Sequence, residues 1–376
     1  MIKKSVLALA LAGLLSSPAY ADVTINGFAS IKAGMTTGSN DTLYGYADDL
    51  DFKNESLMAL QVRSDLGEKL SVTAQLMGRG NNDFDIGFEW AFLTYELTDN
   101  MRINAGRLRT PFYKYSDYMD VGYAYDWSRV PQSVYSLGFD NIEGISLYRT
   151  AQLGSFDSTL QLIFGAYSGN ISLAGSAASA KIDSIAGITW ELGQDWFNLR
   201  AAYLSGKVTI DAPALQPLLG GLQQVGLPQV ATSVDFADDK GVFIGLGATI
   251  DRNNLIAVFE FNKVDVEDTF FAERENYYLS VGYRFDTITP YVSFEREEHS
   301  SKAEIYQPLT TALPPQLLLP LIGTVESLAF EADTFNIGMR YDFHPSAAFK
   351  AQFSSQKDKI QNDRSGLITV GVDLVF

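Results

Sequence analysis

The segment NYYLSVGYRFD, residues 276–286, alternates apolar and polar side chains with a period of two. Its apolar positions are Tyr277, Leu279, Val281, Tyr283 and Phe285, and the positions between them include Asn276, Ser280, Arg284 and Asp286. Because successive side chains of a strand point to opposite faces of a sheet, this pattern predicts a β-strand with one apolar face.

The same alternation recurs at 196–203, 254–262 and 347–354. Hydrophobic residues make up 46% of the chain, yet no run after residue 21 approaches the length of about 18 apolar residues that a membrane-spanning helix needs. Long helical periodicity is also almost absent. These observations exclude a helical membrane protein and favour a chain built from alternating strands.

Connections of two kinds separate the alternating segments. Counting the segments predicts about sixteen strands, at 22–35, 54–66, 69–79, 86–97, 101–109, 141–151, 155–167, 181–192, 196–207, 240–250, 254–264, 274–285, 288–297, 328–343, 346–356 and 365–376. Short turns lie near 67–69, 98–100, 153–155, 193–195, 251–253, 286–287 and 344–346. Longer connections lie near 36–53, 110–140, 168–180, 206–239, 264–273, 297–328 and 356–364, with one short exception near 80–85.

Short turns at one end and long loops at the other are typical of a transmembrane antiparallel β-barrel. A soluble β-sandwich also alternates, but its loops are comparable at both ends. Closure into a barrel leaves no unpaired strand edge in lipid, and about sixteen strands enclose a lumen wide enough to hold water. We therefore predict an all-β transmembrane barrel.

The two ends of the chain support this prediction. Lys3 and Lys4, an apolar run at 6–15 and the sequence Ala19-Tyr20-Ala21 are typical of a secretory signal peptide, which predicts removal of residues 1–21 and a single barrel domain at 22–376. In the last segment Ile368, Val370, Val372, Leu374 and Phe376 alternate to the final residue. We expect this strand to close the sheet against the first strand and to place Phe376 at the lipid interface.

Composition excludes several functions. The formal net charge is −17, and loss of Lys3 and Lys4 would make the chain more acidic still, so it is a poor binder of nucleic acid. The chain has no cysteine and only two histidines, so we expect no metal site, no cofactor and no disulfide. His299 stands beside Ser300, and His344 stands in a predicted turn, but neither has a convincing Asp or Ser partner for catalysis. We predict that the protein is not an enzyme.

Three pieces of the chain carry a family resemblance: DVTINGFASIKAG at 22–34, INAGRLRTPF at 103–112 and GLITVGVDLVF at 366–376. With these pieces, residues 22–376 resemble the general Gram-negative porins of the trimeric, 16-stranded type. The resemblance implies an outer-membrane channel for passive diffusion of small hydrophilic solutes and ions. It also implies an inward-folded third loop, a homotrimer in contact with lipid and lipopolysaccharide, and recognition of Phe376 by the barrel assembly machinery.

The third long connection, 109–141, is the most informative stretch for function. From Phe112 to Tyr135 it carries eight aromatic residues, namely Phe112, Tyr113, Tyr115, Tyr118, Tyr123, Tyr125, Trp127 and Tyr135. The same part carries the charged residues Lys114, Asp117, Asp120, Asp126 and Arg129, and Arg107 and Arg109 precede it. A loop of about 30 residues without secondary structure is usually functional. We predict a constriction at 110–140 in which aromatic rings pack on the wall and charges face the passage; an ordinary surface loop is the alternative.

Basic residues on the polar faces of several strands would oppose this loop: Arg63, Arg79, Arg200, Arg284, Arg340 and Lys350. The resemblance implies that Arg107 faces the lumen, whereas alternation places it with Met101, Ile103 and Ala105 on an apolar face. A bulge near Gly106 would reconcile the two. The acidic Pro-Glu-Phe-Gly-Gly element found in the third loops of enterobacterial relatives is absent, so the constriction charges cannot be placed by resemblance.

Selectivity has competing determinants. Acidic outer loops would favour cations and inward arginines would favour anions. Because screening acts over about 8–10 Å, the constriction should decide, and we expect anions to be tolerated. A substrate-specific channel for a sugar or an organic or aromatic acid, with the loop aromatics as a sliding surface, is the alternative function.

Two other connections are apolar and rich in Pro and Leu, at 212–231 and 307–327. They could pack on each other, cover the channel mouth or contact lipopolysaccharide.

Overall fold

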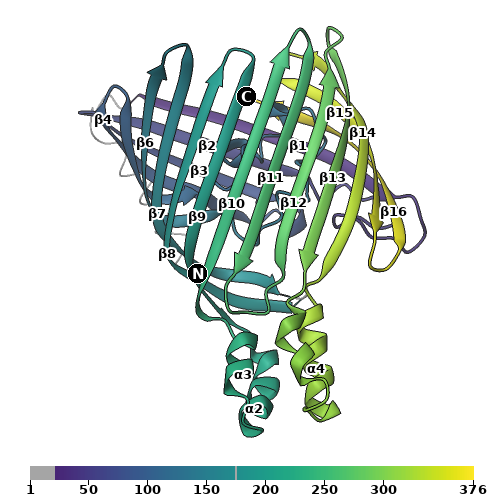
Figure 1. Ribbon diagram of the computed structural model, residues 1–376. Coiled ribbons are helices and arrows are strands. Elements are labelled where there is room, and N and C mark those ends of the chain that lie inside the picture. The colour runs from purple at the N-terminus through teal and green to yellow at the C-terminus, as the bar shows by residue number, and fades with distance from the viewer. Residues whose placement is uncertain (1–21, 174–175) are drawn as a thin grey trace, which may run out of the picture.

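The computed structural model describes residues 22–173 and 176–376, so the predicted signal peptide at 1–21 lies outside the described residues. Sixteen antiparallel strands form one closed barrel in which each strand pairs with its neighbour in sequence and β16 pairs with β1 (Figure 1). The strands are β1 (Val23–Thr36), β2 (Leu57–Gly67), β3 (Leu70–Arg79), β4 (Ile86–Thr98), β5 (Met101–Arg109), β6 (Asn141–Leu153), β7 (Phe156–Leu173), β8 (Ser176–Gln194), β9 (Phe197–Asp211), β10 (Ala237–Arg252), β11 (Leu255–Val266), β12 (Glu273–Tyr283), β13 (Ile288–Ser300), β14 (Phe330–His344), β15 (Ala347–Asp358) and β16 (Asp363–Val375). The predicted fold class and strand count are confirmed.

The barrel closes at the two ends of the chain. Phe28 pairs with Val375, and the backbone groups of Gly27 and Phe376 exchange hydrogen bonds of 2.7 and 2.9 Å. A Cβ atom at residue 27 would lie 2.3 Å from the Phe376 ring, so a larger residue there would have to displace this ring. The Phe376 side chain is 61% exposed, on the outside of the closed sheet.

The two faces of the sheet match a barrel in lipid. In β12, Asn276, Tyr278 and Ser280 are buried on the inside, whereas Leu279 is 48% exposed on the outside. This arrangement, with polar side chains inward and apolar side chains outward, is the reverse of that in a soluble barrel. The alternation predicted for 276–286 is therefore observed.

The alternation changes face near the loop end of β7 and β8. Leu162 and Phe164 of β7 are exposed on the outer face, but register shifts follow at Gly165–Tyr167 and at Asp183–Ala186. Beyond these irregularities, apolar side chains such as Leu173 point inward and are buried. The long connection predicted at 168–180 is wrong, because the inverted pattern continues both strands to Leu173 and Ser176.

The loops between β9 and β10 and between β13 and β14 contain short helices that the sequence patterns did not predict. The first has the 3-10 helix η4 (Pro213–Leu215) with α2 (Gln216–Gln224) and α3 (Pro228–Val234); the second has η5 (Ala303–Ile305), η6 (Gln307–Leu309) and α4 (Pro315–Glu326). They project from the loop end of the barrel (Figure 1). Leu222 of α2 and Leu321 of α4 are fully buried in one cluster, so the two apolar loops pack on each other. None of the described helices is long and apolar enough to cross a membrane.

Candidate functional site

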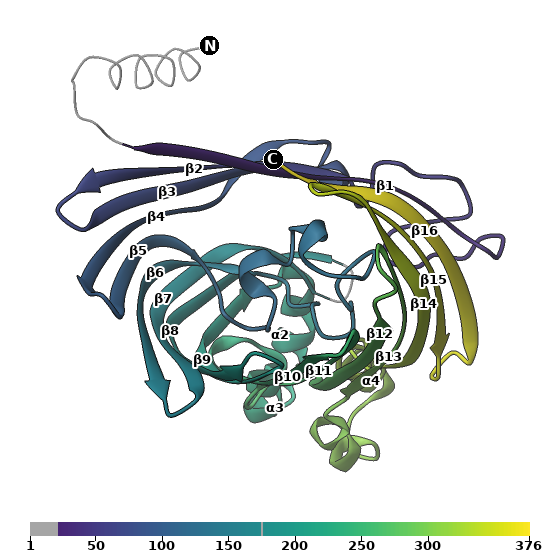
Figure 2. The same ribbon diagram turned by 90° about the horizontal axis from the view of Figure 1, so that it is seen from above.

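The residues that connect β5 to β6, 110–140, lie inside the ring of strands (Figure 2). Two short 3-10 helices, η2 (Ser116–Tyr118) and η3 (Gly122–Ala124), shape this segment, which we call the third loop. The Trp127 indole Nε1 donates a hydrogen bond of 2.8 Å to Ser280 Oγ on β12. The Tyr123 hydroxyl donates one of 2.9 Å to the carbonyl of Pro345, in the turn between β14 and β15. The loop therefore reaches from β5 to the opposite wall.

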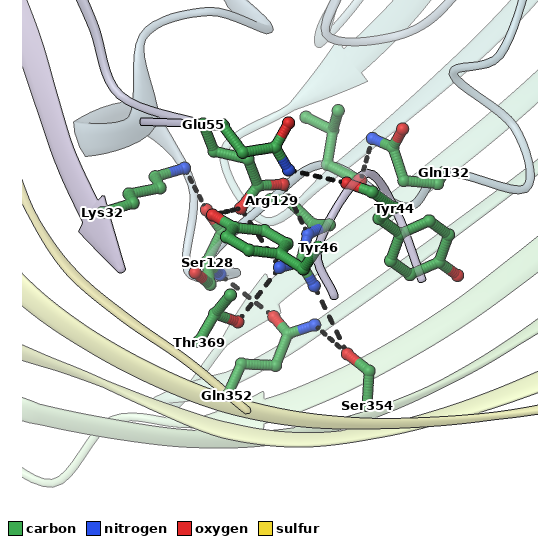
Figure 3. A network of polar contacts seen from close by, with 12 residues as sticks. Lys32, Tyr44, Tyr46, Glu55, Ser128, Arg129, Gln132, Gln352, Ser354 and Thr369 are labelled. Carbon is green, nitrogen blue, oxygen red and sulfur yellow. Dashed lines mark hydrogen bonds and ion pairs between the residues drawn. The ribbon is translucent and has the colours of Figure 1, made fainter. Parts of the chain in front are cut away.

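One anchor of the third loop is Arg129 (Figure 3). Its Nε donates to Glu55 Oε1 at 2.6 Å and its Nη2 to Glu55 Oε2 at 3.1 Å, which joins the third loop to the loop between β1 and β2. Nη2 also donates to Thr369 Oγ1 of β16 at 3.1 Å. Arg129 is only 5% exposed. Burial alone would raise the pKa of Glu55, but the positive charges of Arg129 and Lys32 outweigh it and lower that pKa below its ordinary value.

A second anchor surrounds Asp120. Its carboxylate lies 2.6 Å from Arg109 Nη2 and 3.0 Å from Arg79 Nη2. Glu89 of β4 forms ion pairs with both arginines, at 3.1 Å from Arg109 and 2.7 Å from Arg79. Asp140, at the far end of the loop, also pairs with Arg109. Burial opposes ionisation of Asp120, but Arg109 and Arg79 outweigh it and lower its pKa. Charges of both signs are thus neutralised where the loop leaves the wall.

Basic side chains of the wall bind the backbone of the third loop. Arg200 of β9 donates to the carbonyls of Pro111 and Phe112, and Arg340 of β14 donates to those of Tyr123 and Tyr125. Lys350 of β15 donates to the carbonyls of Gly122 and Trp127, at 2.5 and 2.8 Å, and also pairs with Asp373 at 2.9 Å. These cations therefore hold the loop in place.

The remaining predicted wall residues lie apart from the loop. Arg284 follows β12 on the turn side and forms a two-point ion pair with Asp251, at 2.6 and 2.7 Å. Arg63 of β2 is exposed on the face that carries Ala59 and Gln61, and it has no ion pair within the part of the chain that the structure describes. Neither Arg63 nor Arg284 therefore belongs to the groups of residues that anchor the third loop.

The structure corrects the prediction that Arg107 faces the lumen. Neither the β4–β5 nor the β5–β6 ladder shifts register at Gly106, so the bulge is wrong and simple alternation holds. Arg107 pairs with Glu143 at 2.9 Å. Glu143 lies two residues before Ile145, whose side chain is 53% exposed on the outer face. Arg107 therefore belongs to the outer surface, outside the cluster of loop charges.

The loop aromatics form a core against the wall. Phe112, Tyr113, Tyr115, Tyr125 and Trp127 are buried, Tyr123 and Tyr135 are partly buried, and Tyr118 is 37% exposed. The Tyr113 and Tyr135 rings are 4.4 Å apart, and Trp127 lies edge-on to Tyr278 of β12 at 5.5 Å. Such packing stabilises one conformation of the loop.

Few loop charges face open space. Asp117 is exposed, Lys114 and Asp126 are half-buried, and Lys114 Nζ donates to Asn198 Oδ1 on β9. Neither aspartate has an ion pair or a side-chain hydrogen bond within the described ranges 22–173 and 176–376. Asp117, Asp126 and Lys114 are thus the loop charges that a passing solute would meet.

Acidic residues of the wall were missed by the sequence patterns. Glu260 of β11 accepts hydrogen bonds from the hydroxyls of Tyr135 and Tyr278, at 2.5 and 2.6 Å, and Glu295 of β13 accepts from the backbone NH and hydroxyl of Ser133. Glu260 occupies the polar face of an alternating segment, which was a usable signal. The wall therefore carries both signs of charge rather than the basic lining that was expected.

Comparisons with known proteins agree with this architecture. The sequence matches the model of the family described as Gram-negative porin over residues 7–361, and no curated protein matches it. Among solved structures it is similar to the outer membrane channel DcaP of Acinetobacter baumannii (12% identity, 96% of this chain and 99% of that chain, TM-score 0.62). It is also similar to the anion-selective porin from Comamonas acidovorans (13%, 95% and 100%, TM-score 0.58) and to the trimer form of OmpT from Vibrio cholerae (11%, 95% and 99%, TM-score 0.55). At these identities the solved structures show the fold alone.

Proposed function

Because this chain belongs to the Gram-negative porin family and forms an outer-membrane channel, we propose that its third loop, 110–140, sets the narrowest part of the passage. The channel would admit small hydrophilic solutes and ions by passive diffusion. The observation that carries this proposal is the set of contacts from one loop to several walls: Arg129 to Glu55, Asp120 to Arg79, and Lys350 to the loop carbonyls.

The sorting of charges suggests weak ion selectivity. Arg79, Arg200, Arg340 and Lys350 are occupied by carboxylates or carbonyls, so they offer little free positive charge to an anion. The loop charges left near open space are of both signs, Lys114 against Asp117 and Asp126. Local charges within a Debye length of about 8–10 Å dominate ion preference at physiological salt.

The loop aromatics do not favour a sliding surface for a sugar or an aromatic acid. A sliding surface needs exposed ring faces, but Phe112, Tyr115 and Trp127 are buried in the loop core. Tyr118 alone of the eight has an exposed side chain. We therefore prefer the general diffusion channel to a specific channel that works through these rings.

Partners are proposed on narrower grounds. A homotrimer agrees with the OmpT structure from Vibrio cholerae, which is described as a trimer. The exposed terminal ring of Phe376 suits recognition by the barrel assembly machinery, and the apolar outer face suits contact with lipid and lipopolysaccharide.

We propose no enzymatic role, which agrees with the channel family. His344 Nδ1 accepts a hydrogen bond from the Ser346 backbone NH, and the His299 ring packs 5.7 Å from the Phe330 ring. His299 is the penultimate residue of β13.

Single-channel recording of the purified protein in planar bilayers tests the proposal. We expect stepwise insertion and a current that rises linearly with voltage and salt, with closure in three steps if the channel is a trimer. Deleting residues 114–128 should increase the conductance, because it removes the part of the loop that lies farthest from β5 and β6. A chain that inserts without conductance would contradict the channel, and a deletion without effect on conductance would contradict the constriction.

A further inference from the structure

A cavity of about 280 Å³ lies between the last part of the third loop and the inner wall of β7–β11 at the loop end of the barrel. Part of its lining, including Ile171, Leu173 and Ile182, points inward because the alternation inverts at the register shifts of β7 and β8. Further lining comes from apolar residues on the regular inner faces of β9 and β10. Its lining includes Leu137, Phe139, Ile182, Leu204 and Phe243. This lining differs from the polar inner face elsewhere, where water is the expected neighbour.

One end of the cavity carries an arginine that has no counter-ion within the described part of the chain. Arg274 of β12 lines the cavity, and its guanidinium lies 4.6 Å from the centre of the Phe271 ring. Its Nε is buried and lacks a hydrogen-bond partner, and Arg274 has no ion pair among the residues that the structure describes. A buried cationic donor without a partner is costly, so a ligand that satisfies it gains affinity.

The acidic residues nearby are engaged elsewhere or out of reach. Asp265, which also lines the cavity, pairs with Lys302 at 2.8 Å. Glu273 and Glu275 of the same strand both pair with Lys263. Glu297, on the neighbouring strand β13, is not within ion-pair distance of Arg274. The guanidinium is thus left to recognise an anion from solution.

We propose that this cavity binds an amphipathic organic monoanion, a carboxylate that carries a single ring or a short apolar chain. The carboxylate pairs with the Arg274 guanidinium, and the apolar part lies against Leu204, Phe243 and Phe139. A neutral apolar solute would leave Arg274 unpaired, and a dianion would place its second charge among apolar side chains or beside Asp265. The site lies at the loop end of the barrel, so a solute that enters from the loop side would bind there before it reaches the constriction. This inference rests on the proposed channel.

Block of the ion current in planar bilayers, with the full chain and solute added on the loop side, tests the site. Benzoate is the probe, acetate supplies the charge without the ring, and benzyl alcohol supplies the ring without the charge. We expect saturable block by benzoate at concentrations at least about tenfold below those at which either control acts. Equal potency of acetate and benzoate would overturn the proposal.

Two variants separate the cavity from the channel. R274Q should raise the half-blocking benzoate concentration about tenfold or more and leave conductance unchanged, because it removes a charge-assisted contact. R284Q, which changes an arginine on the turn side, is the matched control, and benzoate should block it as strongly as the wild type. I182N should weaken benzoate block with Arg274 intact. If benzoate blocks R274Q as strongly as the wild type, the binding site is overturned but the channel is not. If the wild type does not conduct at all, the proposed channel itself is overturned.

Discussion

Arg129 and Glu55 join two loops that are 74 residues apart in sequence, through a two-point ion pair of 2.6 and 3.1 Å inside the barrel. Thr369 and Ser354 accept two further hydrogen bonds from the guanidinium, and the Tyr44 ring lies 5.3 Å from its Cζ atom (Figure 3). The pair fixes the third loop to the loop between β1 and β2, and the contacts with Thr369 and Ser354 fix it to β16 and β15.

Breaking this pair on one side should loosen the loop. R129Q leaves the partly buried Glu55 without its ion-pair partner, which costs on the order of 3 kcal/mol. We expect channels with larger current fluctuations and faster proteolysis of the third loop, while the barrel circular dichroism stays unchanged. The matched control is K181Q, which removes an exposed ion pair with Asp183. A quiet, protease-resistant R129Q channel would contradict the role of Arg129 as an anchor.

The pH dependence of the loop follows from the lowered pKa values of Glu55 and Asp120. A carboxyl whose pKa is lower in the folded state contributes stability above its unfolded pKa and loses it as pH falls through the folded pKa. The ordinary values are about 4.3 for Glu and about 3.9 for Asp. Loss of these two ion pairs should therefore raise the current noise only as pH falls below about 4. In E55Q the noise should already be high at pH 7, and the remaining acid-dependent rise should be smaller.

The limits of sequence reasoning follow from the range of each interaction. Alternation in 276–286 predicted the lipid and lumen faces of β12, because every second side chain of a barrel strand faces the lipid and is apolar. It failed in 168–180, where register shifts change the face without a local sequence signal. It correctly kept Arg107 on the outer face, against the family resemblance.

The charges of the constriction were harder to predict. Arg109, Asp120 and Arg129 were predicted to face the passage, but all three are paired within the loop anchors. Their partners, such as Glu55 and Glu89, stand elsewhere in the chain, and only the closed barrel brings them together. Composition can show that a loop is charged, but it cannot show which charges are already neutralised.

Asp117 should influence ion preference without supporting the loop. It is exposed and has no partner among the described residues, so D117N should fold and conduct like the wild type. The reversal potential in a KCl gradient should move toward anion preference, because the substitution removes a negative charge from the passage. D120N is the contrasting variant: it breaks the second anchor, so it should change current noise and proteolysis more than the reversal potential. The same shift in both variants would contradict this division of roles.

Trp127 should contribute most of the packing energy at the centre of the loop. Its ring is 4% exposed, lies 5.5 Å from the rings of both Tyr115 and Tyr278, and donates a hydrogen bond to Ser280. W127A would leave a large void between loop and wall, at a cost of about 3–5 kcal/mol. Because the sixteen-stranded ladder is untouched, we expect the loop to detach while the barrel remains closed. Conductance should rise and trypsin should cut the loop, whereas Y118A, which removes the exposed ring, should leave protease resistance unchanged. A W127A channel with wild-type conductance and resistance would show that the ion pairs alone hold the loop.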